Sequence, residues 1–493
     1  MTDTLIVETL SPPALLPYGF ARKGGVLLRA GECLHRTDAA LDALLEVQRL
    51  HPSVVFASVT DEAFDAALSA TYGQGAAQAA EFEMDATDLA ALADSVGPVD
   101  DLLDSNDDSP VIRLINAILL EAVKEGASDV HVETTEKRLV VRFRIDGVLR
   151  DVVEPQRALA PLLVSRIKVM AKLDIAEKRV PQDGRVTLRI GGHDVDARVS
   201  TIPTQHGERV VMRLLEKGSL RLDPAGLGMS ERDVDTFRRL LDRPHGMLLV
   251  TGPTGSGKTT TLYAALSRLN DRKRNVMTVE DPIEYELAGV AQTQVNPRTD
   301  MTFARGLRAI LRQDPDVIMV GEIRDQETAE VAVRSAMTGH FVLSTLHTNS
   351  AVGSVTRLLD MGVERYLLAP MLVGLAAQRL VRRLCPDCRW EDTATDADSR
   401  LLGGALKVGK RIWRAGGCDA CHGEGYLGRA GVYEVIAIDS QLQALIHDGA
   451  SEAKLEKAAR ANNPSLLDDG VAKVRAGVTT VEEVARVTRD EGV

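Results

Sequence analysis

Strand-like and helix-like patterns alternate along the middle of the chain. The apolar runs Met247–Val250 and Val317–Val320 and the largely apolar run Phe341–Leu346 are typical of strands that are covered on both faces. Segments of helical character stand between them, for example Thr260–Leu266. Strands that alternate with helices form a parallel sheet with helices on its two faces. We therefore expect residues 241–380 to form an α/β core.

A helix followed by hairpins precedes this core. Apolar residues recur at helical spacing directly after the capping pair Ser109-Pro110. Residues Leu139–Ile145 then alternate between apolar and charged, and Asp146-Gly147 after them supplies the turn of a hairpin. A second hairpin is expected over 185–200. These elements predict a small α+β domain at 109–217.

The remaining parts of the chain carry weaker patterns. Residues Gly25–Leu28 are strand-like and Asp61–Tyr72 are helix-like, whereas the tail is helical and its last helix begins with capping-box spacing at Thr480–Glu483. The expected organisation is an N-terminal domain at 1–95, an acidic linker at 96–108, the α+β domain at 109–217, an interdomain linker at 218–240, the core at 241–380, a cysteine-bearing segment at 381–430 and a helical region at 431–493.

A glycine-rich motif stands between the first strand of the core and the next helix. Residues Gly252–Thr259 match G-x-x-x-x-G-K-[ST] in the strand–turn–helix context that this motif requires. Its glycines let successive N–H groups turn toward an anion, to which the helix dipole adds. Lys258 can then reach the β- and γ-phosphates, and the Thr259 hydroxyl can ligate Mg²⁺. We expect this segment to bind a nucleoside triphosphate. The expected binding residues are Gly252, Pro253, Thr254, Gly255, Ser256, Gly257, Lys258, Thr259 and Thr260.

Two acidic motifs follow in the order expected of a nucleoside triphosphatase. The first is Val279–Glu284, and the second is the apolar run 317–320 followed by Gly321 and Glu322. Such an enzyme needs carboxylates to hold Mg²⁺ and to orient or deprotonate water. Glu284 and Glu322 are the candidates, and the sequence leaves open how they divide these tasks.

A histidine and several arginines are further candidates. His347 ends a predicted strand, where it is either a structural residue or a neutral imidazole that senses the γ-phosphate. Arg198 and Arg213 lie on predicted strands of the α+β domain, and Arg308 and Arg312 lie four residues apart on a predicted helix. A guanidinium can stabilise the charge of a transferred phosphoryl group, although most arginines are surface residues.

Four of the five cysteines form two Cys-x-x-Cys pairs, and Cys33 stands alone as a small apolar residue. Four thiolates close a tetrahedral Zn²⁺ shell and leave no open position, which predicts a structural site. Unrelated buried thiols and a redox-active pair are the alternatives. The candidate zinc ligands are Cys385, Cys388, Cys418 and Cys421.

Composition narrows the class of protein. The net charge is −12 and aromatic residues make up 3%, which argues against a nucleic-acid partner. No run reaches the roughly 18 apolar residues that a membrane span needs, and the N-terminus lacks a signal-peptide pattern. We therefore expect a cytoplasmic protein.

The motifs together resemble those of the cytoplasmic ATPases of type II secretion systems, within the wider secretion and type IV pilus ATPase superfamily. The resemblance covers residues 109–493. It rests on Ser128–Glu133, the phosphate-binding loop, an Asp box at Glu280–Glu284, Gly321–Asp325, a His box at Thr338–Thr348, the four cysteines and Gly428–Glu434.

The resemblance implies an α/β fold with a RecA-like P-loop ATPase core, an α+β domain before it, a zinc-binding insert and a helical C-terminal region. It implies hydrolysis of ATP with Mg²⁺, a bound Zn²⁺ and a homo-hexameric ring. The N-terminal domain would dock on the cytoplasmic domain of an inner-membrane secretion protein, beside an inner-membrane platform protein and an acidic phospholipid surface. The protein would then be peripheral on the cytoplasmic face of that membrane and power assembly of a pilus-like piston.

The resemblance also gives roles to single residues, and it implies interdomain or intersubunit roles for Arg308, Arg312 and Arg324. The catalytic residues it implies are Lys258, Glu284, Glu322, His347, Arg198 and Arg213. Three other functions share parts of this pattern: a type IV pilus assembly ATPase, a nucleic-acid motor and a non-hydrolysing adaptor stapled by zinc.

Overall fold

The computed structural model describes residues 24–29, 32–37, 39–51, 54–60, 63, 64, 67, 89, 110–190, 193–216 and 224–488. They fall into two compact units, which divide after residue 216, with the turn at 146–148 assigned to the second unit. The expected acidic linker at 96–108 and most of the helix-like stretch at 61–72 lie outside the described residues. Within the described part of the chain, no helix is long and apolar enough to cross a membrane.

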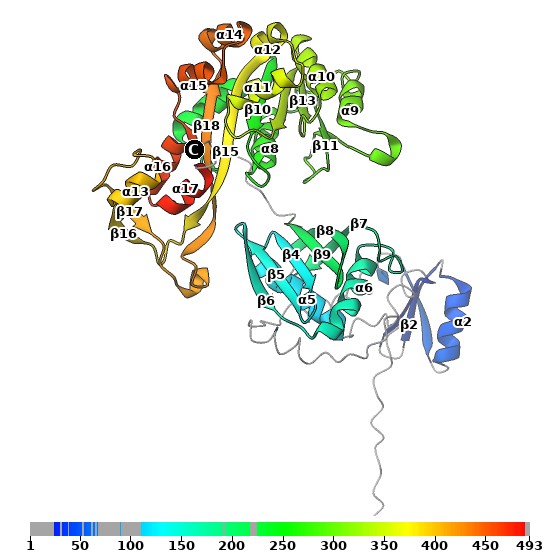
Figure 1. The fold of residues 1–493 in the computed structure, drawn as a ribbon. Helices are drawn as coiled ribbons and strands as arrows, with labels where there is room; N and C mark the ends of the chain where they lie inside the picture. The colour runs from blue at the N-terminus through cyan, green and yellow to red at the C-terminus, as the bar shows by residue number, and fades with distance from the viewer. Residues whose placement is uncertain are drawn as a thin grey trace, which may run out of the picture. The chain divides into compact units, whose positions relative to one another are not determined.

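The first unit begins with a small βαβ element. Strand β1 pairs antiparallel with β2, β2 pairs parallel with β3, and α2 is the crossover helix between β2 and β3 (Figure 1). The expected strand at Gly25–Leu28 is confirmed as β1. The bounds are Val26–Arg29 for β1, Glu32–Arg36 for β2, Leu41–Leu50 for α2 and Val55–Val59 for β3.

A six-stranded sheet with helices forms the larger part of this unit. The strand order is β6-β5-β4-β9-β8-β7, and the pairs β4–β5, β4–β9, β9–β8 and β8–β7 are antiparallel. Both hairpins and the helix after Ser109 are confirmed. The bounds are Pro110–Lys124 for α5, Asp129–Thr134 for β4, Leu139–Ile145 for β5, Val148–Val153 for β6, Arg157–Leu159 for the short helix η1, Ala160–Met170 for α6, Gln182–Ile190 for β7, His193–Thr204 for β8 and Gly207–Glu216 for β9.

The second unit is built on a seven-stranded sheet of order β12-β11-β13-β14-β10-β15-β18. The first six strands are parallel and β18 is antiparallel to β15. The predicted parallel α/β core is therefore confirmed. The strand bounds are Gly246–Thr251 for β10, Val276–Glu280 for β11, Ala291–Gln294 for β12, Val317–Val320 for β13, Phe341–Leu346 for β14, Leu372–Leu384 for β15 and Tyr426–Ala437 for β18.

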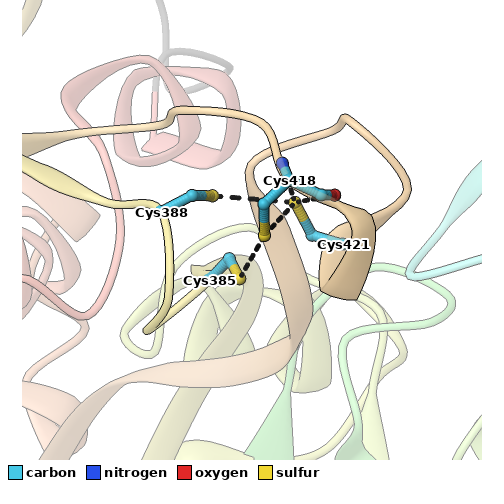
Figure 2. A group of neighbouring side chains, drawn as sticks. All are labelled: Cys385, Cys388, Cys418 and Cys421. Carbon is cyan, nitrogen blue, oxygen red and sulfur yellow. Dashed lines mark hydrogen bonds between the residues drawn. The ribbon is translucent and has the colours of Figure 1, made fainter.

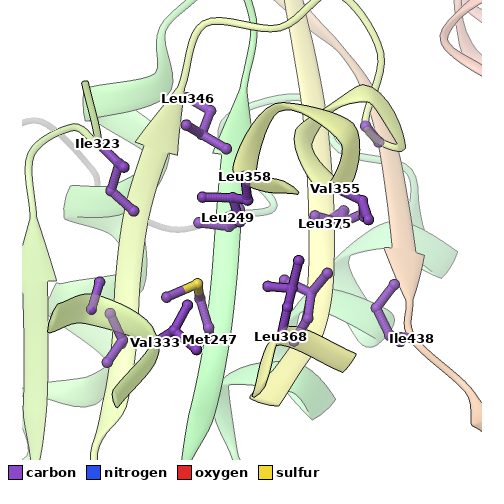
Figure 3. Packing of buried hydrophobic residues seen from close by; sticks show 14 of the residues in the cluster. Met247, Leu249, Ile323, Val333, Leu346, Val355, Leu358, Leu368, Leu375 and Ile438 are labelled. Atoms are coloured by element: carbon purple, nitrogen blue, oxygen red, sulfur yellow. The ribbon is translucent and has the colours of Figure 1, made fainter. Parts of the chain in front are cut away.

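Helices cover both faces of this sheet because its strands are apolar on both sides. Met247 and Leu249 of β10 point into one core, with Leu346 and Leu375 (Figure 3), and Leu248 points into the other. The first core includes residues of α9 (Phe303–Ile310), α10 (Gln326–Met337), α11 (Gly353–Asp360), α12 (Arg365–Met371), α14 (Ser440–His447) and α15 (Glu452–Arg460). The second includes residues of α7 (Glu231–Leu241) and α8 (Lys258–Leu269).

The cysteine-bearing segment is an insertion between two paired strands. It leaves the sheet at the end of β15 and returns at the start of β18, which pair with each other along most of their length. Its own core, which includes Leu406 and Ile412, is completed by Val474 and Val484 of the last two helices. The bounds are Trp390–Thr393 for β16, Asp396–Leu401 for α13, Arg411–Arg414 for β17, Asp419–Cys421 for η3, Leu466–Arg475 for α16 and Val481–Thr488 for α17. The short helix η2 spans Pro297–Thr299.

The structure corrects three expectations from the sequence. The segment 218–240 is not wholly a linker, since α7 begins within it and buries Phe237 in the core. The boundaries at 380 and 430 fall inside β15 and β18, because the insertion interrupts a hairpin and is not a separate piece of chain. Arg312 lies beyond α9, which ends at Ile310.

Candidate functional site

The glycine-rich loop joins the buried strand β10 to α8, which begins at Lys258. Gly252 and Gly257 adopt positive φ values of 148° and 87°. A Cβ atom on Gly252 would lie 2.5 Å from the main-chain oxygen of Gln378, so this turn accommodates only glycine. The loop therefore curls tightly at the N-terminal end of α8, where N–H groups and the helix dipole favour an anion.

The Lys258 side chain lies in this loop and is 8% exposed. Its Nζ donates to the main-chain oxygens of Gly252 at 2.7 Å and Pro253 at 3.0 Å. Burial lowers the pKa of Lys258 to about 8, while the Glu322 carboxylate acts to raise it and the Arg379 guanidinium lowers it further. The positive charge of Lys258 is therefore only partly compensated by its partners in the loop. This favours replacement of the two carbonyl oxygens by phosphate oxygens.

Glu322 follows strand β13, and its side chain is 15% exposed. Its carboxylate contacts Arg324 Nη2 at 2.5 Å and His347 Nε2 at 3.2 Å. The parallel pairing of β13 with β14 brings the ends of these strands together. The structure thus assembles Glu322, His347 and Arg324, and the influence of Glu322 on the pKa of Lys258 joins this group to the loop.

Glu284 lies on the loop after β11, which neighbours β13 in the sheet. It is half-buried, and its main-chain N–H donates to the hydroxyl of Tyr263 at 3.2 Å. Thr259 is exposed at the start of α8, and Thr260 beside it is half-buried. Both acids therefore stand at the edge of the sheet that carries the glycine-rich loop, as expected for the carboxyl ends of parallel strands.

Two residues of β15 support the loop and were missed in the sequence. Gln378 is buried, accepts from Thr261 Oγ1 at 2.6 Å and lies against the loop glycines. Arg379 is buried and donates to the main-chain oxygen of Asn349 at 2.7 Å. The only signal for them was a polar pair within the otherwise apolar run Leu375–Val381 of this strand.

Arg198 and Arg213 of the first unit lie directly opposite each other on β8 and β9. Arg185 continues the row on β7, and Asp129 on β4 is opposite Arg213, whose Nε donates to it at 2.9 Å. Cross-strand partners share one face of a sheet. This face therefore carries a row of arginines with a carboxylate beside Arg213.

The remaining candidate arginines lie on the surface formed by α9 and α10. Arg308 pairs with Glu327 of α10. Arg312 Nη1 donates to the main-chain oxygen of Arg308 at 2.7 Å.

The four cysteines of the insertion converge from two knuckles, as Figure 2 shows. All four sulfur atoms lie within 4.8 Å of one another, and three of the Sγ–Sγ distances are 3.7, 3.7 and 3.8 Å. Zinc–sulfur bonds of about 2.3 Å in a tetrahedron place the sulfurs about 3.8 Å apart.

The thiols of the cluster differ in acidity. Burial acts to raise the pKa of Cys421, but the N–H groups of Cys418 and Gly425 outweigh it and lower the pKa to about 6, whereas burial raises the pKa of Cys388 and of Cys418. Thiolate is the form that binds metal. This donor set therefore fits Zn²⁺, and Cys385, Cys388, Cys418 and Cys421 would hold it.

Comparison with known proteins places these sites in context. Residues 104–486 match the family model "Type II/IV secretion system protein", and residues 15–72 match a domain model of "GSPII protein E". The chain is 56% identical to "Type II secretion system protein E" of Pseudomonas aeruginosa, over 99% of this chain and 98% of that protein. It is 54% identical to "Type II secretion system ATPase E" of Vibrio cholerae, over 96% of this chain and 97% of that protein.

Solved structures resemble a large part of the chain. A crystal structure of the pilus retraction motor PilT with bound ADP superposes with a TM-score of 0.54 at 27% identity, over 76% of this chain and 97% of that one. The ATPase DotB of Legionella pneumophila gives a TM-score of 0.58 at 20% identity, over 76% of this chain and 95% of that one, which is a likeness of fold.

Proposed function

This chain belongs to the type II secretion system protein E family, which is a family of ATPases, and we propose that its hydrolysis of ATP drives assembly of a pilus-like piston that exports proteins. The observation that carries this proposal is the group of Lys258, Glu322 and His347 at the mouth of the glycine-rich loop. The loop supplies an anion site, and the acid beside it supplies a base for water.

The loop residues 252–260 would hold the triphosphate through their N–H groups. Lys258 would exchange its two carbonyl partners for the β- and γ-phosphate oxygens, since an ammonium group pairs more strongly with charged oxygens. Mg²⁺, when bound with the nucleotide, supplies positive charge that neutralises the phosphates, and Thr259 is the residue that would hold it.

Glu322 and Glu284 would orient the attacking water and accept its proton. His347 holds one carboxylate oxygen of Glu322 and so limits the directions in which that acid can point. His347 would then sense the γ-phosphate through the same carboxylate. Parallel strands that end beside the loop support this geometry.

The arginine row of the first unit would be offered to the γ-phosphate. Arg198 and Arg213 would stabilise the charge that spreads over the transferred phosphoryl group. Their cross-strand pairing supports this role, because it places both guanidinium groups on one face of the sheet.

We further propose a homo-hexameric ring that is peripheral on the cytoplasmic face of an inner membrane. Its N-terminal domain would dock on the cytoplasmic domain of an inner-membrane secretion protein, beside a platform protein and acidic phospholipid. Leu41, Leu45 and Val55 of this domain are 71%, 61% and 63% exposed, which supports a docking surface there.

Docking through this surface is tested by Leu41→Asp/Leu45→Asp. We expect the variant to lose co-purification with the inner-membrane secretion protein and to keep its ATPase activity, because a charge is costly in an apolar interface. Met337→Asp, which places a charge at another exposed apolar residue, serves as the control. Unchanged co-purification of the double variant would show that the partner binds elsewhere.

Replacing Glu322 with glutamine tests the proposed chemistry. Glutamine keeps the shape of the side chain but removes the proton acceptor, so we expect kcat for ATP hydrolysis to fall by about 10² to 10³ with ATP affinity retained. Glu327→Gln, which removes a carboxylate from the exposed face of α10, is the matched control. If Glu322→Gln hydrolyses ATP as fast as the parent, Glu322 does not activate water, and the same assay on Glu284→Gln identifies the acid that does.

A role in type IV pilus assembly is not favoured. The curated relatives that match nearly the full chain at 51–56% identity are named as type II secretion proteins. The pilus motor PilT resembles a smaller share of the chain, and at the lower identity of 27%.

A further inference from the structure

A buried tyrosine links the helix of the phosphate-binding loop to the loop that carries Glu284. Tyr263 lies on the second turn of α8 and is 1% exposed. Its hydroxyl donates to the Glu280 carboxylate and accepts the main-chain N–H groups of Glu284 at 3.2 Å and Tyr285 at 3.5 Å. A single hydroxyl thus contacts both the strand β11 and the loop that follows it.

The Glu280 carboxylate is the fixed end of this arrangement. It is 3% exposed, and it also accepts from Thr278 Oγ1 at 2.6 Å and Gln292 Nε2 at 3.0 Å. Three donors therefore satisfy a buried acid, which explains why Glu280 is held in place and is unavailable for contact with water. The tyrosine O–H donates to Glu280, and the lone pairs of its oxygen accept the N–H groups of the loop.

Gln292 of the edge strand β12 holds the far side of the same loop. Its Oε1 accepts from the main-chain N–H of Leu287 at 2.7 Å, and its Nε2 donates to the main-chain oxygen of Tyr285 at 3.0 Å. The rings of Tyr263 and Tyr285 meet edge to face, with centroids 6.0 Å apart. The loop is thus attached at both ends by side chains that do not touch nucleotide in the proposed mechanism.

We infer that Tyr263 is a positioning residue for ATP hydrolysis: its hydroxyl holds the backbone of Glu284 at a set distance from the phosphate-binding helix. The inference rests on the proposed role of Glu284. Because α8 begins at Lys258 and bears Tyr263 in its second turn, one helix positions both the phosphate-binding ammonium and the loop of the acid. Buried polar contacts of this kind fix geometry within the tolerance that catalysis requires.

Burial and the bond to Glu280 raise the pKa of Tyr263. The hydroxyl therefore stays protonated at neutral pH and can donate to Glu280 while it accepts from the loop.

The variant Tyr263→Phe separates positioning from packing, since it keeps the ring and removes the hydroxyl. We expect full-length Tyr263→Phe to stay folded at the assay temperature and to show a kcat lowered about 10- to 100-fold, with KM for ATP near that of the parent. The melting temperature should fall moderately, because the buried Glu280 carboxylate loses one of its three donors. Hydrogen exchange at the Glu284 and Tyr285 amides should be faster than in the parent. Tyr426→Phe is the matched control, because it removes a hydroxyl that contacts Thr480 Oγ1 at 3.0 Å. It should change neither kcat nor the exchange of the Glu284 and Tyr285 amides.

The variant Gln292→Leu removes the tether on the other side of the loop and should give the same selective loss of kcat. An unchanged kcat in both variants overturns the inference, and so does a lowered kcat with parental exchange at the Glu284 amide. Failure of the proposed function is distinguishable, because it is seen as parental hydrolysis by both Glu322→Gln and Glu284→Gln, whereas the exchange measurement reports on the tether alone.

Discussion

Lys258→Ala is expected to lower ATP hydrolysis by at least about 10³ and to weaken ATP binding about 10- to 100-fold. The ammonium is the only cationic side chain within the glycine-rich loop itself, and it already makes two hydrogen bonds there. Steady-state hydrolysis and calorimetric titration of ATP with magnesium measure the two effects. Retention of parental affinity would show that the loop binds the triphosphate without this side chain.

The pH dependence of ATP binding provides a control for the Lys258→Ala variant. The pKa of Lys258 is lowered to about 8, mainly by burial. Phosphate charge favours the ammonium, so binding takes up a proton above that pH, and affinity should fall as the pH rises through 8. The slope should be absent in Lys258→Ala.

The stability of the folded chain should change with pH in the opposite direction to ATP affinity: it should rise as the pH rises through 8. A lysine whose pKa is lower in the folded than in the unfolded chain destabilises the fold below the folded pKa, and this effect fades as the pH rises. Lys258→Ala should therefore melt no lower than the parent at pH 7. If the melting temperature of Lys258→Ala drops sharply, its loss of activity is caused by unfolding.

The second large effect is expected for Cys385→Ser/Cys388→Ser. Four thiolates at tetrahedral spacing would bind zinc with about 10–16 kcal/mol of apparent free energy, and the insertion has only a small core of its own. Metal analysis should find about one zinc per chain in the parent and almost none in the variant. The insertion should become sensitive to protease, and because Val474 and Val484 complete its core, the last two helices should loosen with it.

Cys33→Ser is the control for zinc content, since Cys33 lies buried in the core of the small N-terminal domain and is not one of the four clustered cysteines. It should keep the zinc of the parent. If the double variant keeps the zinc content of the parent, Cys385 and Cys388 do not bind the metal.

Local pattern was enough for the features that depend on neighbouring residues. The glycine-rich turn needs a strand before it and a helix after it, and all three are contiguous in the sequence. The cysteine pairs and the turn at Asp146-Gly147 are local in the same way. The apolar runs of the core strands were equally clear, because a strand covered on both faces has no polar side.

Tertiary structure alone decided which distant residues meet. Gln378 lies against a loop more than a hundred positions earlier, because β15 pairs with β10. Arg198 and Arg213 face each other only because of the register between β8 and β9. Such partners depend on strand order and register, which local periodicity does not encode.

The same reason explains the expectations that needed correction. The cysteine segment reads as a separate unit in the sequence, yet it interrupts the β15–β18 hairpin and shares its core with helices near the C-terminus. The sequence by itself therefore determined the α/β class, the phosphate-binding loop and the four candidate metal ligands, whose chemistry is carried by adjacent residues. The grouping of Glu322 with His347, the arginine row and the tether through Tyr263 followed only from long-range packing.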